Sequence, residues 1–170
     1  MKPSLWYRMD VIARRLTPFG LTLTLVLASI LPLHIPGYAR VVPALPLIAV
    51  YFWAVYRPNL LPAYAVFLIG LLHDSLSGTP IGMNAVILLV VYGAVISQRR
   101  FLVGKPFVIV WMGFVLVAGG AELAGWSMIS IFNVTISEPR AALVQYLLTL
   151  GFFPFLSWFF LRWIRIFLEM

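Results

Sequence analysis

Uncharged, mostly apolar stretches make up most of this chain, and charged residues interrupt them at only a few points. A helix that spans a membrane needs about 20 mostly apolar residues, with a range of about 17 to 25. By this measure the chain contains six spanning helices, of which the second, third and fourth are short. The predicted spans are residues 16–36, 41–56, 58–73, 83–97, 106–129 and 141–161. We therefore predict an all-α integral membrane protein, a six-helix bundle with a single transmembrane domain over residues 1–170.

Composition supports this class and excludes others. The 170 residues are 63% hydrophobic and only 10% charged, whereas soluble domains are about half apolar and about a quarter charged. This excludes an ordinary cytosolic domain, a disordered chain and, despite the net charge of +7, a nucleic-acid binder. The chain has no cysteine, so disulfides, thiolate catalysis and cysteine-based metal sites are also excluded.

The basic residues predict an orientation. With a cytoplasmic N-terminus, ten of the twelve lysines and arginines lie on the cytoplasmic side, and only Arg40 and Arg140 lie outside. A bias of this size is a strong orientation signal when loops are short. We expect both termini to be cytoplasmic, residues 6–15 to lie along the inner membrane face, and the positive charge to favour anionic membrane lipids.

The segment that joins the third and fourth predicted spans has the sequence GLLHDSLSGTPIGMN. The apolar part of the span that follows it covers only about two thirds of the hydrocarbon core. We therefore expect this segment to be re-entrant in the outer half of the membrane, where irregular backbone must be sheltered by protein or line a wet cavity. Glycine and proline supply its turns, and short polar side chains satisfy its backbone. The candidate pocket or loop residues are His73, Asp74, Gly78, Pro80, Gly82 and Asn84.

Asp74 is the most informative single residue of this segment, because a carboxylate near membrane depth usually marks function or a specific polar partner. It is either a ligand contact or proton site, or a cap that accepts hydrogen bonds from backbone N–H groups of the loop or the next helix. We favour the cap. A metal site at His73 and Asp74 is disfavoured, since His34 is the only other histidine and no carboxylates cluster nearby.

Glu122 is the second carboxylate within a predicted span. Small residues and one tryptophan share its helical face, and small residues let another helix approach closely. Glu122 therefore faces protein, either in a buried contact to a partner helix or to Arg140, or as a protonated, hydrogen-bonded core residue; we leave these alternatives open. The candidate helix–helix interface consists of Ala118, Gly119, Glu122, Gly125 and Trp126.

Catalysis has little support in the sequence. It contains no Ser-His-Asp set with suggestive spacing, no H-E-x-x-H and no glycine-rich phosphate loop. We predict that the protein is not an enzyme and binds no cofactor. With short loops throughout, function must come from the bundle, its lipid-facing surface or proteins bound to it.

The joining segment, in a six-helix protein of this size with a basic start, resembles the rod shape-determining protein MreD family. The resemblance covers nearly the whole chain and is most specific at Gly70, Asp74, Gly78, Pro80 and Gly82. It implies an architecture similar to that of the substrate-binding subunits of energy-coupling-factor vitamin transporters. Those subunits commonly carry an A-x-x-x-A pattern on the first helix, where this chain has Thr24 and Ala28.

The resemblance also implies a function. Relatives are non-enzymatic components of the bacterial inner membrane that associate with MreC and act with MreB, RodA and its penicillin-binding transpeptidase in lateral peptidoglycan synthesis and rod shape. The alternative is a substrate-capture subunit of a vitamin-like transporter, which the missing A-x-x-x-A pattern disfavours. Self-association as a homodimer through the small-residue faces stays open.

Overall fold

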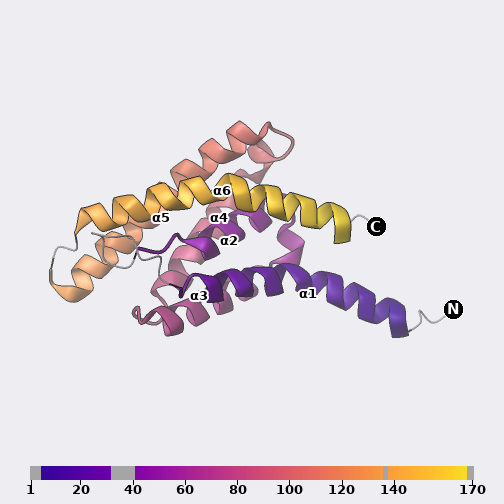
Figure 1. Cartoon of the computed structure of the whole chain (residues 1–170), viewed down its shortest axis with the longest axis horizontal. Helices are drawn as coiled ribbons and strands as arrows, with labels where there is room; N and C mark the ends of the chain where they lie inside the picture. The colour runs from indigo at the N-terminus through magenta and orange to yellow at the C-terminus, as the bar shows by residue number, and fades with distance from the viewer. Residues whose placement is uncertain (1–4, 32–40, 136–137, 168–170) are drawn as a thin grey trace.

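The computed structural model describes residues 5–31, 41–135 and 138–167. These residues form six α-helices and one short 3₁₀-helix, η1 (Figure 1). Their bounds are α1 Leu5–Ala28, α2 Leu45–Tyr56, η1 Pro58–Leu60, α3 Ala63–Ser77, α4 Met83–Leu102, α5 Phe107–Asn133 and α6 Pro139–Phe167. The predicted all-helical class with six helices is therefore confirmed for the described part of the chain.

Four of these helices are long and apolar enough to cross a membrane: α4, α5, most of α6 and the Val11–Ala28 part of α1. The other two are shorter, because α2 has 12 residues and α3 has 15. At about 1.5 Å per residue they extend only about 18 and 22 Å, against a hydrocarbon core of about 30 Å. The long apolar helices are those of a membrane protein.

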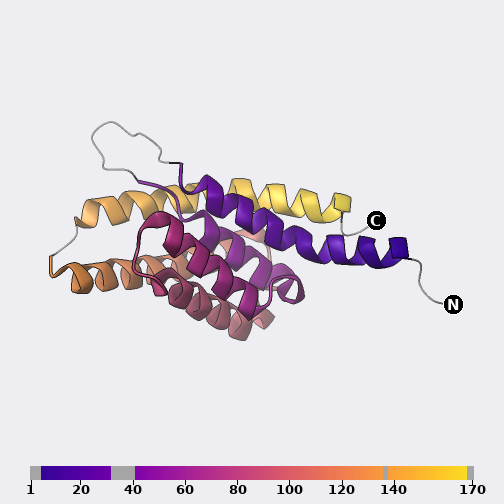
Figure 2. The same ribbon diagram turned by 90° about the horizontal axis from the view of Figure 1, so that it is seen from below.

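The helix bounds differ from the predicted spans at several ends. Residues 6–15 belong to α1 and continue directly into its apolar part, and α1 ends at Ala28, well before the predicted end at residue 36. Residues 32–40, which include Arg40, lie outside the described residues. The start of α1 and the end of α6 lie at the same end of the molecule (Figures 1 and 2).

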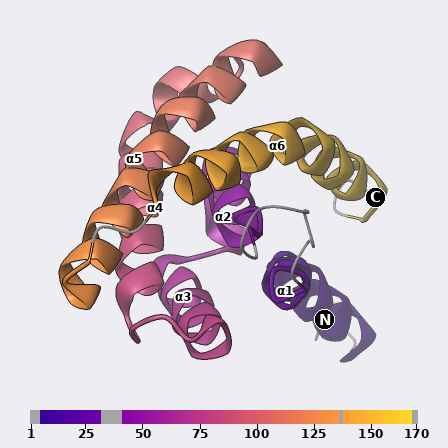
Figure 3. The same cartoon turned by 60° about the vertical axis from the view of Figure 1, so that its left-hand side comes forward.

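Helix α2 is the centre of the bundle. Every residue of Leu45–Val55 is buried, and α1, α3, α4 and α6 surround the helix (Figure 3). A helix that is apolar on all sides is stable only where protein or lipid covers all of them. Here protein does so, which makes α2 the hydrophobic core rather than a lipid-facing span.

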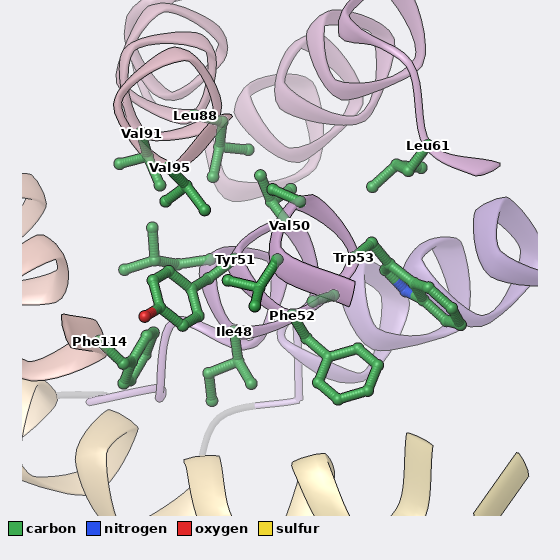
Figure 4. Packing of buried hydrophobic residues seen from close by; sticks show 14 of the residues in the cluster. Ile48, Val50, Tyr51, Phe52, Trp53, Leu61, Leu88, Val91, Val95 and Phe114 are labelled. Carbon is green, nitrogen blue, oxygen red and sulfur yellow. The ribbon is translucent and has the colours of Figure 1, made fainter. Parts of the chain in front are cut away.

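Aromatic side chains pack α2 against α5 and α6, the last two helices of the chain (Figure 4). The Tyr51 ring lies edge-on to Phe114 of α5 at a centroid distance of 5.1 Å, and Phe114 stacks on Phe153 of α6 at 4.2 Å. Such aromatic pairs stabilise a core by about 0.5–1.5 kcal/mol beyond the area that they bury. The Tyr51 hydroxyl also donates a hydrogen bond of 2.9 Å to the Val110 carbonyl.

A short buried helix needs partners for the backbone groups at its ends, and neighbouring helices supply them to α2. Before its first turn, the Ala44 N–H donates to Thr149 Oγ1 of α6 at 3.0 Å. In its last turn, the Val55 carbonyl accepts a 2.8 Å hydrogen bond from Arg99 Nε of α4. A positive charge at a helix C-terminus is also favourable for the helix dipole.

Two glycines allow helices to approach closely. A Cβ atom at Gly70 of α3 would lie 2.3 Å from Ala85 Cα of α4, and one at Gly113 of α5 would lie 2.7 Å from the Tyr51 hydroxyl. No side chain fits at either distance. Gly70 therefore marks the crossing point of α3 and α4, which fixes how these two helices meet.

Candidate functional site

The connection between α3 and α4 is a tight turn at the end of the molecule opposite the termini (Figure 2). α3 ends at Ser77, and Gly78 follows with φ of 70° in the left-handed region. Gly82, with φ of 96°, precedes α4. Side chains other than glycine rarely adopt these angles, so the glycines of the motif set the path of the turn. The Met83 N–H donates to the Pro80 carbonyl at 3.1 Å and closes the turn.

The Asp74 carboxylate lies at the centre of this turn and is completely buried. Its Oδ1 accepts hydrogen bonds from Thr79 Oγ1 at 2.8 Å, from Asn84 Nδ2 at 2.8 Å and from the Asn84 N–H at 3.1 Å. Its Oδ2 accepts from the Gly82 N–H at 2.9 Å and from the Ala85 N–H at 3.4 Å. We call these five residues the Asp74 network.

In this arrangement Asp74, a residue of α3, caps the N-terminus of α4. The N-cap residue of α4 is Gly82, which has no side chain to bond the first N–H groups of the helix. Asp74 of α3 bonds two of these N–H groups instead, those of Asn84 and Ala85, and also the N–H of Gly82 itself. Its negative charge lies at the positive end of the α4 dipole. A carboxylate has about four acceptor positions, so five donors leave little capacity for a further ligand.

His73 does not join the Asp74 network. Its side chain is half-buried, and its Nδ1 atom is buried with no hydrogen-bond partner in the part of the chain that the structure describes. Among the same residues, no group of three or more histidines, aspartates or glutamates lies close enough to hold a metal ion. The geometry around His73 and Asp74 therefore supports structure more than ligand chemistry.

The small residues near Glu122 pack against helices of the same chain. Ala118 is completely buried. A Cβ atom at Gly119 would lie 3.5 Å from the Tyr146 hydroxyl of α6, and one at Gly125 would lie 3.7 Å from Ile87 Cδ1 of α4. The fifth candidate, Trp126, is half-buried. The small-residue face of α5 is thus partly covered within the bundle, by α6 on one side and by α4 on the other.

Glu122 itself is half-buried in α5. The hydrogen bonds found between described residues do not reach its carboxylate, and no ion pair within the described ranges joins it to Arg140 in α6. The structure therefore brings Asp74, Gly82 and Asn84 together at one site and leaves Glu122 outside it. The contact to Arg140, one of the alternatives from sequence, is not formed.

Three residues important to these sites escaped the sequence analysis as candidates: Thr79 and Ala85 of the Asp74 network, and Tyr146, whose hydroxyl donates to the Val115 carbonyl at 2.9 Å. Thr79 carried a partial signal, as a short polar residue inside the glycine-rich turn. Ala85 contributes only a backbone N–H, and Tyr146 acts across two helices, so no sequence pattern distinguishes them.

Comparison with known proteins gives one match. A family model described as rod shape-determining protein MreD matches residues 9–169, nearly the whole chain. No curated protein and no solved structure matches the chain. The expected similarity to substrate-binding subunits of vitamin transporters, and the re-entrant depth of the α3–α4 turn, therefore stay predictions.

Proposed function

This chain belongs to the MreD family, whose role is rod shape determination, and we propose that it acts there as a non-enzymatic scaffold of the bacterial inner membrane. In this proposal the bundle crosses the inner membrane several times and binds MreC. It helps direct lateral peptidoglycan synthesis by RodA and its penicillin-binding transpeptidase. MreB is engaged directly or through these partners.

The outer faces of α5 and α6 support a role based on lateral contacts. Both helices are long and apolar, yet large apolar side chains such as Leu116, Leu123, Phe155 and Trp158 are well exposed on them. In a membrane, these faces meet either lipid or the helices of other proteins. Helices associate in membranes through packing and hydrogen bonds, because apolar surface alone gains nothing over lipid.

The observation that carries the proposal is the state of Glu122. A polar group within a membrane-spanning helix is costly unless a partner satisfies it. Glu122 is half-buried, and the hydrogen bonds found between described residues do not reach its carboxylate. Glu122 lies on α5 next to the exposed Leu123. A donor from a helix of another protein, for which MreC is our choice, would satisfy it.

The test is co-purification of MreC with tagged variants from native membranes in mild detergent. We expect Glu122→Leu to reduce the MreC yield at least fivefold at normal abundance of the variant, because it removes the acceptor. Glu122→Gln keeps an acceptor and should retain more MreC than Glu122→Leu does. Leu116→Ala, an exposed position on the same helix, is the matched control and should behave as wild type.

An unchanged MreC yield from Glu122→Leu would contradict the proposed contact. The same experiment also tests the transporter alternative, because that function requires paired cytoplasmic ATPases and a transmembrane coupling subunit to co-purify. The saturated Asp74 carboxylate gives the transporter alternative no support, since its acceptor positions are occupied by groups of the α3–α4 connection.

We also propose that the end of the bundle with the two termini is cytoplasmic. Most basic residues at the ends of described helices lie at this end, while Arg140 at the start of α6 lies at the other, and this bias favours the orientation by the positive-inside rule. Those at this end are Arg57 after α2, Arg99 and Arg100 in the last turn of α4, Lys105 before α5, and Arg165 in the last turn of α6. Labelling of single introduced cysteines from either side of the membrane tests it, because the chain has no native cysteine.

A further inference from the structure

An open groove of about 820 Å³ lies where η1 and the first residues of α3 meet the second half of α4. Asn59, Ala63, Tyr92, Arg99 and Arg100 are among the residues that line it. None of the described residues that line it is acidic, so two arginine charges face the groove with no carboxylate among those residues to balance them. It lies at the opposite end of α4 from the Asp74 network.

Arg99 is held in place within this groove. Its side chain is half-buried, and its Nε donates a 2.8 Å hydrogen bond to the Val55 carbonyl. This bond uses Nε and leaves the two Nη groups outside the contact with α2. A guanidinium fixed through Nε keeps its other N–H donors in a set direction, which suits the paired oxygens of a phosphate. Arg100 is exposed and adds a second, adjustable charge.

The walls of the groove add to the preference for an anion. Tyr92 Oη lies 3.4 Å from the Pro58 carbonyl and joins α4 to η1 on one side. On the other side α3 begins at Ala63 with no side chain capping its N-terminus, so the positive end of its dipole also faces the groove. The arginines remain the main attraction, and the helix end reinforces it.

The surroundings indicate a lipid rather than a soluble anion. Ile96 and Val103 also line the groove, and next to it α3 exposes Tyr64 and Leu68 and α4 exposes Phe101. The two arginines lie in the last turn of the apolar helix α4, which is where a spanning helix reaches the level of the lipid headgroups. A phosphate bound here would therefore have apolar surface beside it for acyl chains.

We propose that this groove is a binding site for the phosphate headgroup of an anionic membrane lipid. Arg99 binds the phosphate in a fixed geometry, Arg100 adds charge, and the outer faces of α3 and α4 accommodate the acyl chains. The proposal rests on the groove and on the membrane class of the protein. It does not depend on the scaffold function or on any contact of Glu122.

Native mass spectrometry of the full chain, purified in mild detergent and supplied with phosphatidylglycerol or phosphatidylcholine, tests the site. We expect wild type to keep one phosphatidylglycerol under conditions that remove phosphatidylcholine. Arg100→Gln should lower this retention at least fivefold. Arg100 is the better position to change than Arg99, because Arg99 also bonds the end of α2.

Two further variants separate the groove from general surface charge. Ala63→Trp fills the groove and leaves every charge in place, and it should also lower retention. Arg165→Gln removes an exposed charge outside the groove and should retain the lipid as wild type does. The melting temperature of each variant shows whether it is folded; if Ala63→Trp is not, Arg100→Gln decides.

Several results would overturn the proposal. Equal losses in Arg100→Gln and Arg165→Gln would reduce the effect to net charge. Full retention of phosphatidylglycerol in Arg100→Gln, or equal retention of both lipids by wild type, would show that the arginines do not select an anionic lipid. Displacement of the lipid by inorganic phosphate or glycerol 3-phosphate at the concentration of the lipid would assign the groove to a soluble phosphate instead.

Discussion

Asp74 and Glu122 are both carboxylates in helices of an otherwise apolar bundle, and their surroundings differ completely. Asp74 is fully buried and accepts five hydrogen bonds from its own chain. Glu122 is half-buried, and the residues described by the structure give it none. Among the described residues, one of the two carboxylates thus has its acceptor positions filled and the other accepts no hydrogen bond.

This difference separates structural from functional use of charge. A buried carboxylate whose acceptor positions are filled stabilises the fold, and its removal leaves the donors without partners. A carboxylate that accepts no hydrogen bond from the described residues contributes little to folding through them and, under the proposed function, is available to another protein. Stability and partner binding should therefore respond to the two residues in opposite order, which the following variants test.

The largest effect is expected from Asp74→Ala. It removes the acceptor of the Thr79 hydroxyl and of the N–H groups at the start of α4, and it leaves the Asn84 side chain with only its 3.3 Å bond to Thr79 Oγ1. Hydrogen bonds to a charged group contribute about 1.5–3 kcal/mol each, so we expect the free energy of unfolding to fall by about 3 kcal/mol or more. Thermal unfolding in detergent measures it. Asp74→Asn, which keeps one oxygen, should lose less; a wild-type melting temperature for Asp74→Ala would refute the capping role.

A smaller loss is expected from Gly70→Ala, which tests whether the close crossing of α3 and α4 holds the network together. The new Cβ would overlap Ala85 Cα at 2.3 Å, and overpacking of this kind costs about 1–3 kcal/mol. Gly93→Ala in α4 is the control, because a Cβ there meets no atom within 4 Å. It should be neutral or stabilising. Equal stability of the two variants would show that the crossing tolerates a wider spacing.

Within the network, Asn84→Ala should cost about 1–2 kcal/mol. Its two side-chain hydrogen bonds, to Asp74 Oδ1 and to Thr79 Oγ1, are lost, while the Asn84 N–H can still bind Asp74. The double variant with Asp74→Ala should lose less than the sum of the two single losses, since the bond from Asn84 to Asp74 is already absent there and only the bond to Thr79 is left to lose. Strict additivity of the two losses, measured by the same melting experiment, would mean that Asn84 acts independently of Asp74.

The smallest effect on stability is expected from Glu122→Gln. With no donor in the described residues to lose, we expect a change within about 0.5 kcal/mol, as for substitutions away from specific contacts. The melting temperature should match wild type. A large loss of stability would show that Glu122 is a structural residue like Asp74 and would remove the contrast between them.

The sequence predicted the class of fold and the number of helices because charged residues delimit the apolar stretches. Helix ends were harder to place. Proline at 58 and 62 separates a 3₁₀-turn from α3, so α3 begins at Ala63 and not at residue 58. The predicted spans were bounded by charged residues, and residues 58–62 are uncharged. That criterion takes no account of the backbone restriction that proline imposes.

The two carboxylates were unequally predictable. Glycine and proline after Asp74 indicated a turn with backbone groups to satisfy, which makes a cap a reasonable expectation. The identity of the donors was not predictable, because it follows from how Gly70 and Ala85 meet. For Glu122, the alternative of a contact to Arg140 neglected helix length. Glu122 lies about 16 Å along α5 from its end at Asn133, whereas Arg140 begins α6 just beyond that end.

The enclosure of α2 has a consequence for how the protein is made. A ribosome delivers α2 to the membrane before α4, α5 and α6 exist, yet in the finished protein these later helices cover it, with Phe153 and Phe160 of α6 packed against its aromatic residues. Until α6 has been synthesised, α2 must be shielded by lipid or by the insertion machinery. The order of synthesis therefore makes α6 the helix that completes the core, and the bundle closes only after the rest of it has been inserted.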